Sequence, residues 1–313
     1  MNKNSRILII GHADVIENSL VQYFRSHKYT NVFSSGLLKV DVLNQKAVEK
    51  FFETKKPEYV FLGSIRSGGI MANQKYAAEF IYENLQCQNN VIHAAYRFGA
   101  KKLLYYAGSC AYPKDARQPI KEESLLTGPL EETSEPYSIA KIAGTKLCET
   151  YNRKYGFKAI TAVPPTVYGP GSDMDVETAH VIGALIAKFH NAVRFGQKEV
   201  VVWGTGKPRR EFLYSDDFVS GSLFLMEHYD GAELINLGCG YDVSIQQLTA
   251  IIKKISGFKG KIAFDSSKPD GTMRKLMDSG RIQRLGWKPE VGLEQGVRRI
   301  WKWYQNLNVR RKT

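Results

Sequence analysis

A tyrosine and a lysine four residues apart, Tyr137 and Lys141, form the sharpest chemical pattern in the sequence. A spacing of four places both side chains on one face of a helix. A neighbouring ammonium can lower the pKa of a phenol until it exchanges a proton near neutral pH. Taken alone, such a pair is more often a solvated pair on a helix surface. Its place on the helical segment that follows a fourth strand-like segment and a loop favours the chemical interpretation.

A second pattern lies near the start, where residues 10–17 follow an apolar run and open a helical pattern. A doubly wound α/β protein presents three glycines at this point to a dinucleotide pyrophosphate. Here only Gly11 is present, and Asp14 and Glu17 stand in the other two places. Asp14 is a good helix N-cap and resembles the start of a capping box with Glu17. We therefore expect a carboxylate to fill the anion site at this helix N-terminus and to oppose a phosphate.

The elements that must position these residues alternate along the first part of the chain, which predicts a parallel sheet covered by helices on both faces. The expected strands are 6–10, 30–34, 59–62, 102–106 and 159–163, and the expected helices are 15–26, 45–54, 74–98 and 136–155. Right-handed crossovers favour a Rossmann-like strand order.

The second part of the chain is less regular and predicts a smaller α/β cap. Its expected elements are helices near 178–192, 215–229, 244–256 and 293–306 and a strand at 199–203. We expect a dinucleotide-binding type of domain over residues 1–170 and a substrate-binding cap over 171–313, interleaved with strands that return to the first sheet. The ligand should lie between them at the carboxyl ends of the strands.

Composition narrows the class of protein. With 313 residues, 43% hydrophobic and 24% charged, the chain is that of an ordinary globular protein. No apolar run reaches the roughly 18 residues of a membrane span, and no signal-peptide pattern opens the chain, so we expect a cytoplasmic protein that does not bind membranes. Cys87, Cys110, Cys148 and Cys239 show neither metal-ligand nor disulfide spacing, and we expect no metal.

The formal net charge of +13 fits a polyanionic small ligand as well as nucleic acid. Because no nucleic-acid recognition motif is present, we expect no nucleic-acid partner. Part of the excess falls on a C-terminal amphipathic pattern, which is typical of a solvated helix face.

Eight segments in order along nearly the whole chain resemble the GDP-L-fucose synthase family, extended members of the short-chain dehydrogenase/reductase superfamily. They are 67–73, 108–114, 135–144, 147–153, 167–170, 180–182, 202–212 and 268–275. The resemblance implies an enzyme that epimerises C3 and C5 of a GDP-4-keto-6-deoxy sugar and reduces the C4 ketone with NADPH. It also implies a homodimer, with the helix of Tyr137 and Lys141 in a shared bundle.

The resemblance assigns roles residue by residue. The catalytic set is Tyr137, Lys141, Cys110, His180 and Ser109. The cofactor set adds Gly11, His12, Asp41, Gly63, Pro164 and Val167 to that tyrosine and lysine, and the GDP-sugar set is Lys188, Trp203, Arg210 and Lys275. The chemistry agrees with these residue types: a 4-keto group acidifies the protons at C3 and C5, and a thiol and an imidazole titrate close enough to neutral pH to exchange them.

The positions that depart from the family pattern are those that bind the dinucleotide and transfer hydride. Asp14 and Glu17 interrupt the glycine turn. The cations that grip the 2′-phosphate of NADPH are replaced by Ala13 and by residues 35–37, which read Ser, Gly and Leu. Gly108 stands where the superfamily has its catalytic Ser or Thr. We expect the neighbouring Ser109 to point to the opposite side, as a one-residue shift in a strand end would require.

Three hypotheses therefore stay open. The chain could be an epimerase and reductase of GDP-4-keto sugars, a cofactor-independent epimerase, or a non-catalytic nucleotide-sugar-binding subunit that partners an active relative. The residues do not decide whether the sugar is a hexose or a heptose, or whether the base is guanine.

Overall fold

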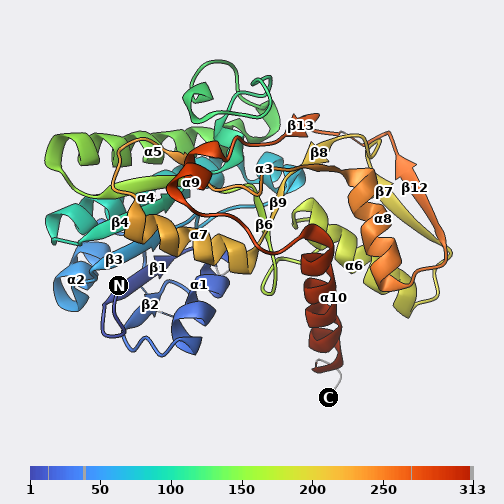
Figure 1. The fold of residues 1–313 in the computed structure, drawn as a ribbon, viewed down its shortest axis with the longest axis horizontal. Helices are drawn as coiled ribbons and strands as arrows, with labels where there is room; N and C mark the ends of the chain where they lie inside the picture. The colour runs from blue at the N-terminus through green and yellow to red at the C-terminus, as the bar shows by residue number, and fades with distance from the viewer. Residues whose placement is uncertain (13, 38–39, 269, 311–313) are drawn as a thin grey trace.

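Six parallel strands form the central sheet of the computed structural model, which describes residues 1–12, 14–37, 40–268 and 270–310 (Figure 1). The strand order is β10-β5-β4-β3-β1-β2. Their bounds are β1 Ile7–Ile10, β2 Val32–Ser34, β3 Tyr59–Leu62, β4 Lys102–Tyr106, β5 Ala159–Val163 and β10 Ile235–Asn236. Every pair in this sheet is parallel. Strand β2 lies on one side of β1 and β3 on the other, so the strand order reverses at β1, and this is the switch point where α/β proteins bind ligands.

Helices cover both faces of this sheet because its strands are apolar on both sides. Leu8 and Ile10 pack in one core with residues of α2 (Gln45–Lys55), α4 (Ala77–Arg97) and α5 (Glu135–Tyr155). Ile7 and Ile9 pack in a second core with α1 (Val15–Ser26) and α7 (Ser215–His228). Continuous burial of this kind is what a two-sided parallel sheet requires. The expected Rossmann-like fold is confirmed.

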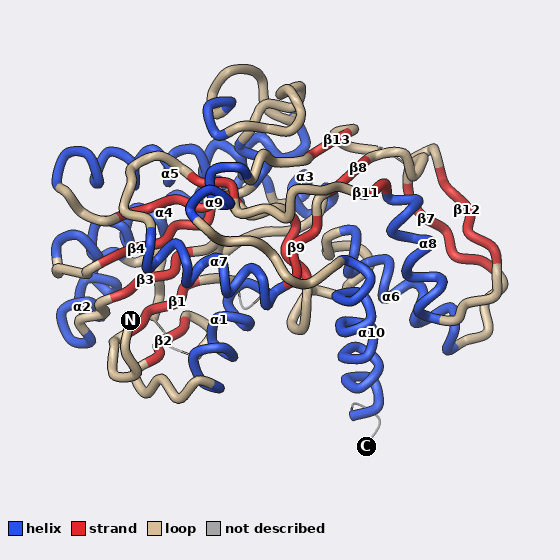
Figure 2. The backbone as a smooth tube through the Cα atoms, in the orientation of Figure 1, coloured by secondary structure: helices blue, strands red, loops and turns tan. Residues whose placement is uncertain are grey.

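The second part of the chain builds a separate group of elements beside the sheet (Figure 2). A third core joins α6 (Val181–Arg194), α8 (Ile245–Ser256) and α10 (Leu293–Arg310). The small sheets pair β7 (Glu199–Trp203) with β12 (Lys261–Asp265), β6 (Thr166–Tyr168) with β9 (Phe212–Tyr214), and β8 (Arg209–Arg210) with β11 (Val243–Ser244) and β13 (Arg274–Lys275). A short helix, α9 (Gly280–Leu285), follows.

Two elements of the second part return to the first. Strand β10 pairs with β5 at the edge of the large sheet, and α7 packs beside α1. A buried cation anchors α7 there, because the Lys102 ammonium donates to the carbonyls of Leu225 and Met226 at 3.0 and 2.9 Å and to Asp230 at 2.8 Å. The domain division at residue 170 stays a prediction.

Two local expectations were wrong. The helix expected over 74–98 is two helices, α3 (Ile70–Lys75) and α4, which are separated at Tyr76 by a backbone with φ −120° and ψ 35°. Ser109 does not lie in a strand end, because β4 ends at Tyr106 and a 3₁₀ turn begins at Ser109. No helix among the described residues is long and apolar enough to cross a membrane.

Candidate active site

The turn after β1 places the Asp14 carboxylate on the first backbone groups of α1. Asp14 is the N-cap, and its Oδ1 accepts hydrogen bonds from Ile16 N at 3.0 Å and Glu17 N at 3.4 Å. Desolvation raises the pKa of Asp14 above its ordinary value, against the opposite effect of these two hydrogen bonds. The expectation that Asp14 caps this helix is confirmed, and the N–H groups that could hold a phosphate have a partner within the chain.

Glu17 ties the same turn to the end of β2. Its side chain is 2% exposed, its Oε1 accepts from Gly36 N at 2.8 Å, and its Oε2 accepts from the Ser35 hydroxyl at 3.1 Å. Ser35 in turn accepts from Gly11 N at 3.1 Å. A buried carboxylate therefore lies where the resemblance predicts a phosphate-binding cation. Ala13, the other position of such a cation, lies outside the described residues.

Other expected cofactor residues lie along the carboxyl edge of the sheet. Gly11, Gly63 and Pro164 directly follow β1, β3 and β5. Gly63 N donates to Ile10 O at 2.7 Å, and a Cβ at Gly63 would lie 3.2 Å from that oxygen, so the turn passes close to β1. His12 is exposed at the same edge.

The surroundings of Val167 and Asp41 give no sign of a role in cofactor binding. Val167 is buried in β6. The Asp41 carboxylate accepts from Leu43 N at 3.0 Å, which is the geometry of an ordinary turn.

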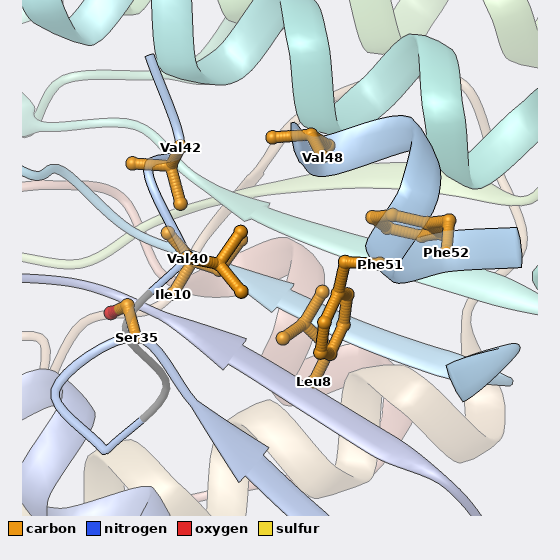
Figure 3. A pocket seen from close by; sticks show the side chains of 8 residues that line it. All are labelled: Leu8, Ile10, Ser35, Val40, Val42, Val48, Phe51 and Phe52. Atoms are coloured by element: carbon orange, nitrogen blue, oxygen red, sulfur yellow. The ribbon is translucent and has the colours of Figure 1, made fainter. Parts of the chain in front are cut away.

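A small cavity lies beside this edge, between β1, α2 and the segment after β2 (Figure 3). Its lining is apolar apart from one hydroxyl and consists of Leu8, Ile10, Ser35, Val40, Val42, Val48, Phe51 and Phe52. A volume of about 20 Å³ holds one water molecule. A planar ring therefore enters here only if these side chains move apart.

Helix α5 carries Tyr137 and Lys141 on one face, as the spacing predicts. The Tyr137 hydroxyl and the Ser64 hydroxyl are 2.7 Å apart. Lys141 is 1% exposed, and its Nζ donates to Tyr106 O at 2.8 Å and lies 5.8 Å from the centroid of the Tyr137 ring. Burial lowers the pKa of Lys141 to about 8.

The expected lowering of the phenol pKa by Lys141 was wrong. Desolvation raises the pKa of Tyr137, and the nearby Cys110 thiol raises it further. The hydrogen bond with Ser64 acts in the other direction. The Lys141 ammonium contacts a backbone carbonyl and not the phenol. Its effect on the pKa of Tyr137 is therefore small compared with the effect of desolvation.

Gly108 faces the reactive end of Tyr137. A Cβ built there would lie 3.9 Å from the Tyr137 hydroxyl and 3.1 Å from Cys110 Sγ. The position therefore points where a catalytic hydroxyl would act, and it has no side chain. Within the described part of the chain, the Ser109 hydroxyl forms no hydrogen bond to Tyr137.

His180 approaches this group from the cap. It is the N-cap residue of α6, and the segment before it packs on the loop after β3 through a 3.0 Å hydrogen bond from Gly69 N to Thr178 O. Desolvation by the protein atoms around the ring lowers the pKa of His180, and the charges of Asp14 and Asp173 oppose that effect. The imidazole keeps solvent access. Asp14 is thus electrostatically coupled to both His180 and Tyr137.

The expected GDP-sugar residues form two groups. Lys188 donates to Val201 O at 2.9 Å, and its Nζ lies 5.0 Å from the ring of Trp203, which is 43% exposed. Arg210 and Lys275 are register partners on β8 and β13, and each is partly exposed. Desolvation lowers the pKa of Lys275, the charge of Cys110 opposes this, and the charge of Arg210 adds to it. The second cation pair is therefore close to the Tyr137 group, and the Lys188 pair lies farther along the cap.

A carboxylate also braces the small sheet that carries Arg210. Asp242 accepts from Arg209 Nε at 2.8 Å and from Arg274 Nε at 2.5 Å. Burial raises the pKa of Asp242, but these two hydrogen bonds outweigh it and hold the pKa below its ordinary value.

Comparison with known proteins gives the family of the chain. Residues 7–238 match the NAD dependent epimerase/dehydratase family. A curated relative, the probable GDP-L-fucose synthase 1 of Oryza sativa subsp. japonica, is 47% identical over 97% of this chain and 93% of its own length. The chain belongs to the GDP-L-fucose synthase group of this family. The recognition made from the sequence is confirmed.

Solved structures of GDP-sugar reductases superpose on nearly the whole chain. A GDP-6-OMe-4-keto-L-xylo-heptose reductase from C. jejuni has a TM-score of 0.93 and 36% identity over 98% of this chain and 99% of its own. A GDP-mannoheptose C4 reductase from Campylobacter jejuni with NADP bound has a TM-score of 0.88 and 38% identity over 97% of this chain and 99% of its own. This family relative therefore holds NADP.

Sequence reasoning missed Ser64 and Glu131. Ser64 contacts Tyr137, and Glu131 accepts from the Thr272 hydroxyl at 3.2 Å and is electrostatically coupled to Arg210 and Lys275. The position of Ser64, directly after Gly63 at a strand end, is a signal that could have found it. Glu131 lies in a loop with no pattern of its own.

Proposed function

We propose that this chain is a nucleotide-sugar enzyme that epimerises C3 and C5 of a GDP-4-keto-6-deoxy sugar and reduces the C4 ketone with NADP(H). The observation that carries the proposal is the Tyr137 hydroxyl, which lies at the carboxyl edge of the sheet with the buried Lys141 behind it and Cys110 beside it. A phenol in such surroundings can hold a ketone oxygen by hydrogen bond and then protonate it.

The nicotinamide end of the site fits a dinucleotide. Gly11 and Gly63 lie in closely packed turns at the switch point, and Tyr137 and Lys141 are proposed to lie at the place of hydride transfer. When bound, the dinucleotide supplies the hydride for C4. Tyr137 gives its proton to the C4 oxygen, and the buried Lys141 cation stabilises the resulting phenolate.

The pyrophosphate end fits less well, and we propose that Asp14 and Glu17 weaken dinucleotide binding without abolishing it. Asp14 competes for the first N–H groups of α1, and Glu17 places a second carboxylate near the end of β2. Because the pKa of Asp14 is raised, its neutral form is more accessible than that of an exposed carboxyl, and the neutral form repels no phosphate.

Cys110 and His180 are the proposed acid and base of epimerisation. The ketone acidifies the protons at C3 and C5, and one group removes a proton while the other returns one on the opposite face. Neutral imidazole can accept a proton, and the lowered pKa of His180 favours that form at neutral pH.

The GDP part of the substrate is proposed to bind in the cap. Arg210 offers a bidentate fork to a phosphate and Lys275 a point charge beside it. Trp203 offers an exposed aromatic face for a base.

We further propose a homodimer through α4 and α5. Both helices expose large apolar side chains, among them Tyr82, Ile139 and Tyr155. The expected cytoplasmic location and the absence of nucleic-acid and membrane partners stay predictions.

The test measures the turnover of GDP-4-keto-6-deoxymannose with NADPH and with NADH. The readout is the loss of the reduced nicotinamide. Tyr137→Phe removes the reacting hydroxyl and keeps the ring, so we expect a fall of roughly 100-fold or more in kcat. Tyr155→Phe on the same helix is the matched control. Equal turnover by Tyr137→Phe and the unaltered chain would contradict the proposal.

A further inference from the structure

A hydroxyl at position 108, which is Gly in this chain, would stabilise the negative charge that forms during ketone reduction. As hydride reaches C4, negative charge develops on the C4 oxygen, and a single donor such as Tyr137 leaves part of that charge unbalanced. A second preorganised donor of this kind is worth on the order of 100-fold or more in kcat. Gly108 cannot supply it, and the Ser109 hydroxyl does not reach Tyr137 in the described part of the chain.

Ser64 contacts the Tyr137 hydroxyl from the loop after β3, the strand next to β4. Strands β3 and β4 are paired, with Leu62 opposite Tyr105, so the residues that follow them emerge side by side. Ser64 lies two residues beyond Leu62, and its Oγ is 2.7 Å from the Tyr137 hydroxyl. A Cβ at Gly108 would lie 3.9 Å from that hydroxyl, so a Ser there would bring its own Oγ to the same place.

Hydrogen-bond capacity leaves Ser64 able to serve a substrate. A hydroxyl has one donor hydrogen and two acceptor sites. When a ketone binds, the single Tyr137 hydrogen turns from Ser64 to the ketone oxygen, and the Ser64 hydrogen is directed to the same oxygen, whose two lone pairs accept both. A ketone oxygen about 2.7 Å from each hydroxyl completes a triangle with ordinary hydrogen-bond lengths.

We propose that Ser64 is a catalytic residue that supplies the ketone-oxygen donor in place of position 108. The proposal rests on the reductase function given above. In the step, C4 receives a hydride from the reduced dinucleotide, the C=O π bond becomes a C–O bond, and the oxygen takes the proton of Tyr137. Ser64 donates a hydrogen bond throughout and keeps its own proton. The products are the C4 alcohol and the oxidised dinucleotide.

The test uses three variants of the full chain. Ser64→Ala removes the hydroxyl at a half-buried loop position, and Ser67→Ala removes one on the same loop as the matched control. Ser64→Ala combined with Gly108→Ser moves the hydroxyl to the neighbouring strand. The backbone at Gly108 has φ −129°, which any residue adopts, and the Cys110 sulfur must shift by a few tenths of an ångström to admit the new side chain.

We expect Ser64→Ala to lower kcat for ketone reduction about 100-fold with little change in KM, and Ser67→Ala to act like the unaltered chain. The double variant should recover at least ten-fold over Ser64→Ala, because a hydroxyl at 108 addresses the same oxygen. A role for Ser64 confined to loop structure would not be rescued from position 108.

Three results would overturn the inference, and the third differs from the others because it also removes the proposed function. If the unaltered chain reduces the ketone and Ser64→Ala does so equally well, or if the double variant shows no recovery, Ser64 is not the donor and the reductase function stands. If the unaltered chain shows no reduction at all under any condition, the proposed function fails and the inference fails with it.

Discussion

Replacing Asp14 by Asn should strengthen dinucleotide binding while leaving the helix intact. The amide keeps an oxygen for the N–H groups of residues 16 and 17, and Asn caps helices about as well as Asp. The change therefore removes the charge and keeps the cap, which separates electrostatic exclusion from loss of structure.

The magnitude follows from the geometry of the cap. Oδ1 lies 3.0 and 3.4 Å from the two backbone nitrogens, and a phosphate oxygen bound to the same groups would stand about 3 Å from them. The two anions would then be about 5 Å apart, which costs about 3 kcal/mol at an effective dielectric constant of about 20. Rotation of the Asp14 side chain away from the site recovers part of this cost. We expect the Kd for NADPH and NADH to fall about 10-fold to 150-fold, or about 1.4 to 3 kcal/mol.

The assay is titration calorimetry with NADH over a range of pH, because NADH lacks the 2′-phosphate that would itself titrate. The pKa of Asp14 is already raised in the free chain, and a bound diphosphate raises it further. Binding therefore takes up a proton, and the Kd of the unaltered chain should fall as the pH falls toward that pKa. The Asn variant should bind with a Kd that varies little with pH.

Equal Kd values for the two chains, with the same pH profile, would refute the electrostatic argument. Thermal unfolding is the control, and we expect the two unfolding temperatures to agree. A large fall in stability of the Asn variant would show that Asp14 holds the turn by more than its cap.

Three further predictions concern other parts of the molecule. His180→Asn should abolish solvent proton exchange at C3 and C5 of the 4-keto sugar, measured by deuterium uptake, while reduction of a substrate with inverted C3 and C5 persists. Lys102→Met should lower the free energy of unfolding by about 1–3 kcal/mol in a denaturant titration, since it removes the buried donor to the carbonyls of Leu225 and Met226 and one of the two cations that pair with Asp230; unchanged stability would contradict the role given to this cation. Asp242→Asn should cost roughly 1–2 kcal/mol at neutral pH. Because the folded pKa of Asp242 lies below its ordinary value, this difference should persist above about pH 4 and disappear as the pH falls through the folded pKa; a difference that stays constant in acid would contradict it.

Much of the fold could be predicted because local patterns and burial agree in this chain. The strands at 59–62, 102–106 and 159–163 consist mostly of apolar residues, and the sheet buries both of their faces. The end of α5 was also predictable, since Gly156 adopts φ 65° directly after it. The break between the two helices at Tyr76 could not be predicted, because residues 74–98 contain no Pro or Gly that would mark it.

The site was less predictable, because side-chain partners come from elements far apart in the sequence. The spacing of Tyr137 and Lys141 fixed their common face, but it could not show that Lys141 donates to a backbone carbonyl. Glu17 appeared as a missing glycine, and the structure shows its carboxylate bonded at the end of β2. The contact between Ser64 and Tyr137 joins residues 73 positions apart, and no local pattern encodes such a contact.

An isotope experiment can show whether this chain transfers hydride to the C4 ketone of a GDP-4-keto sugar, as we propose. The purified chain is incubated with GDP-4-keto-6-deoxymannose and a nicotinamide dinucleotide that carries deuterium at the transferring carbon. We expect the unaltered chain to form a product with one deuterium at C4, and Tyr137→Phe to form none. A product inverted at C3 or C5 that keeps its ketone and carries no deuterium at C4 would contradict the proposal.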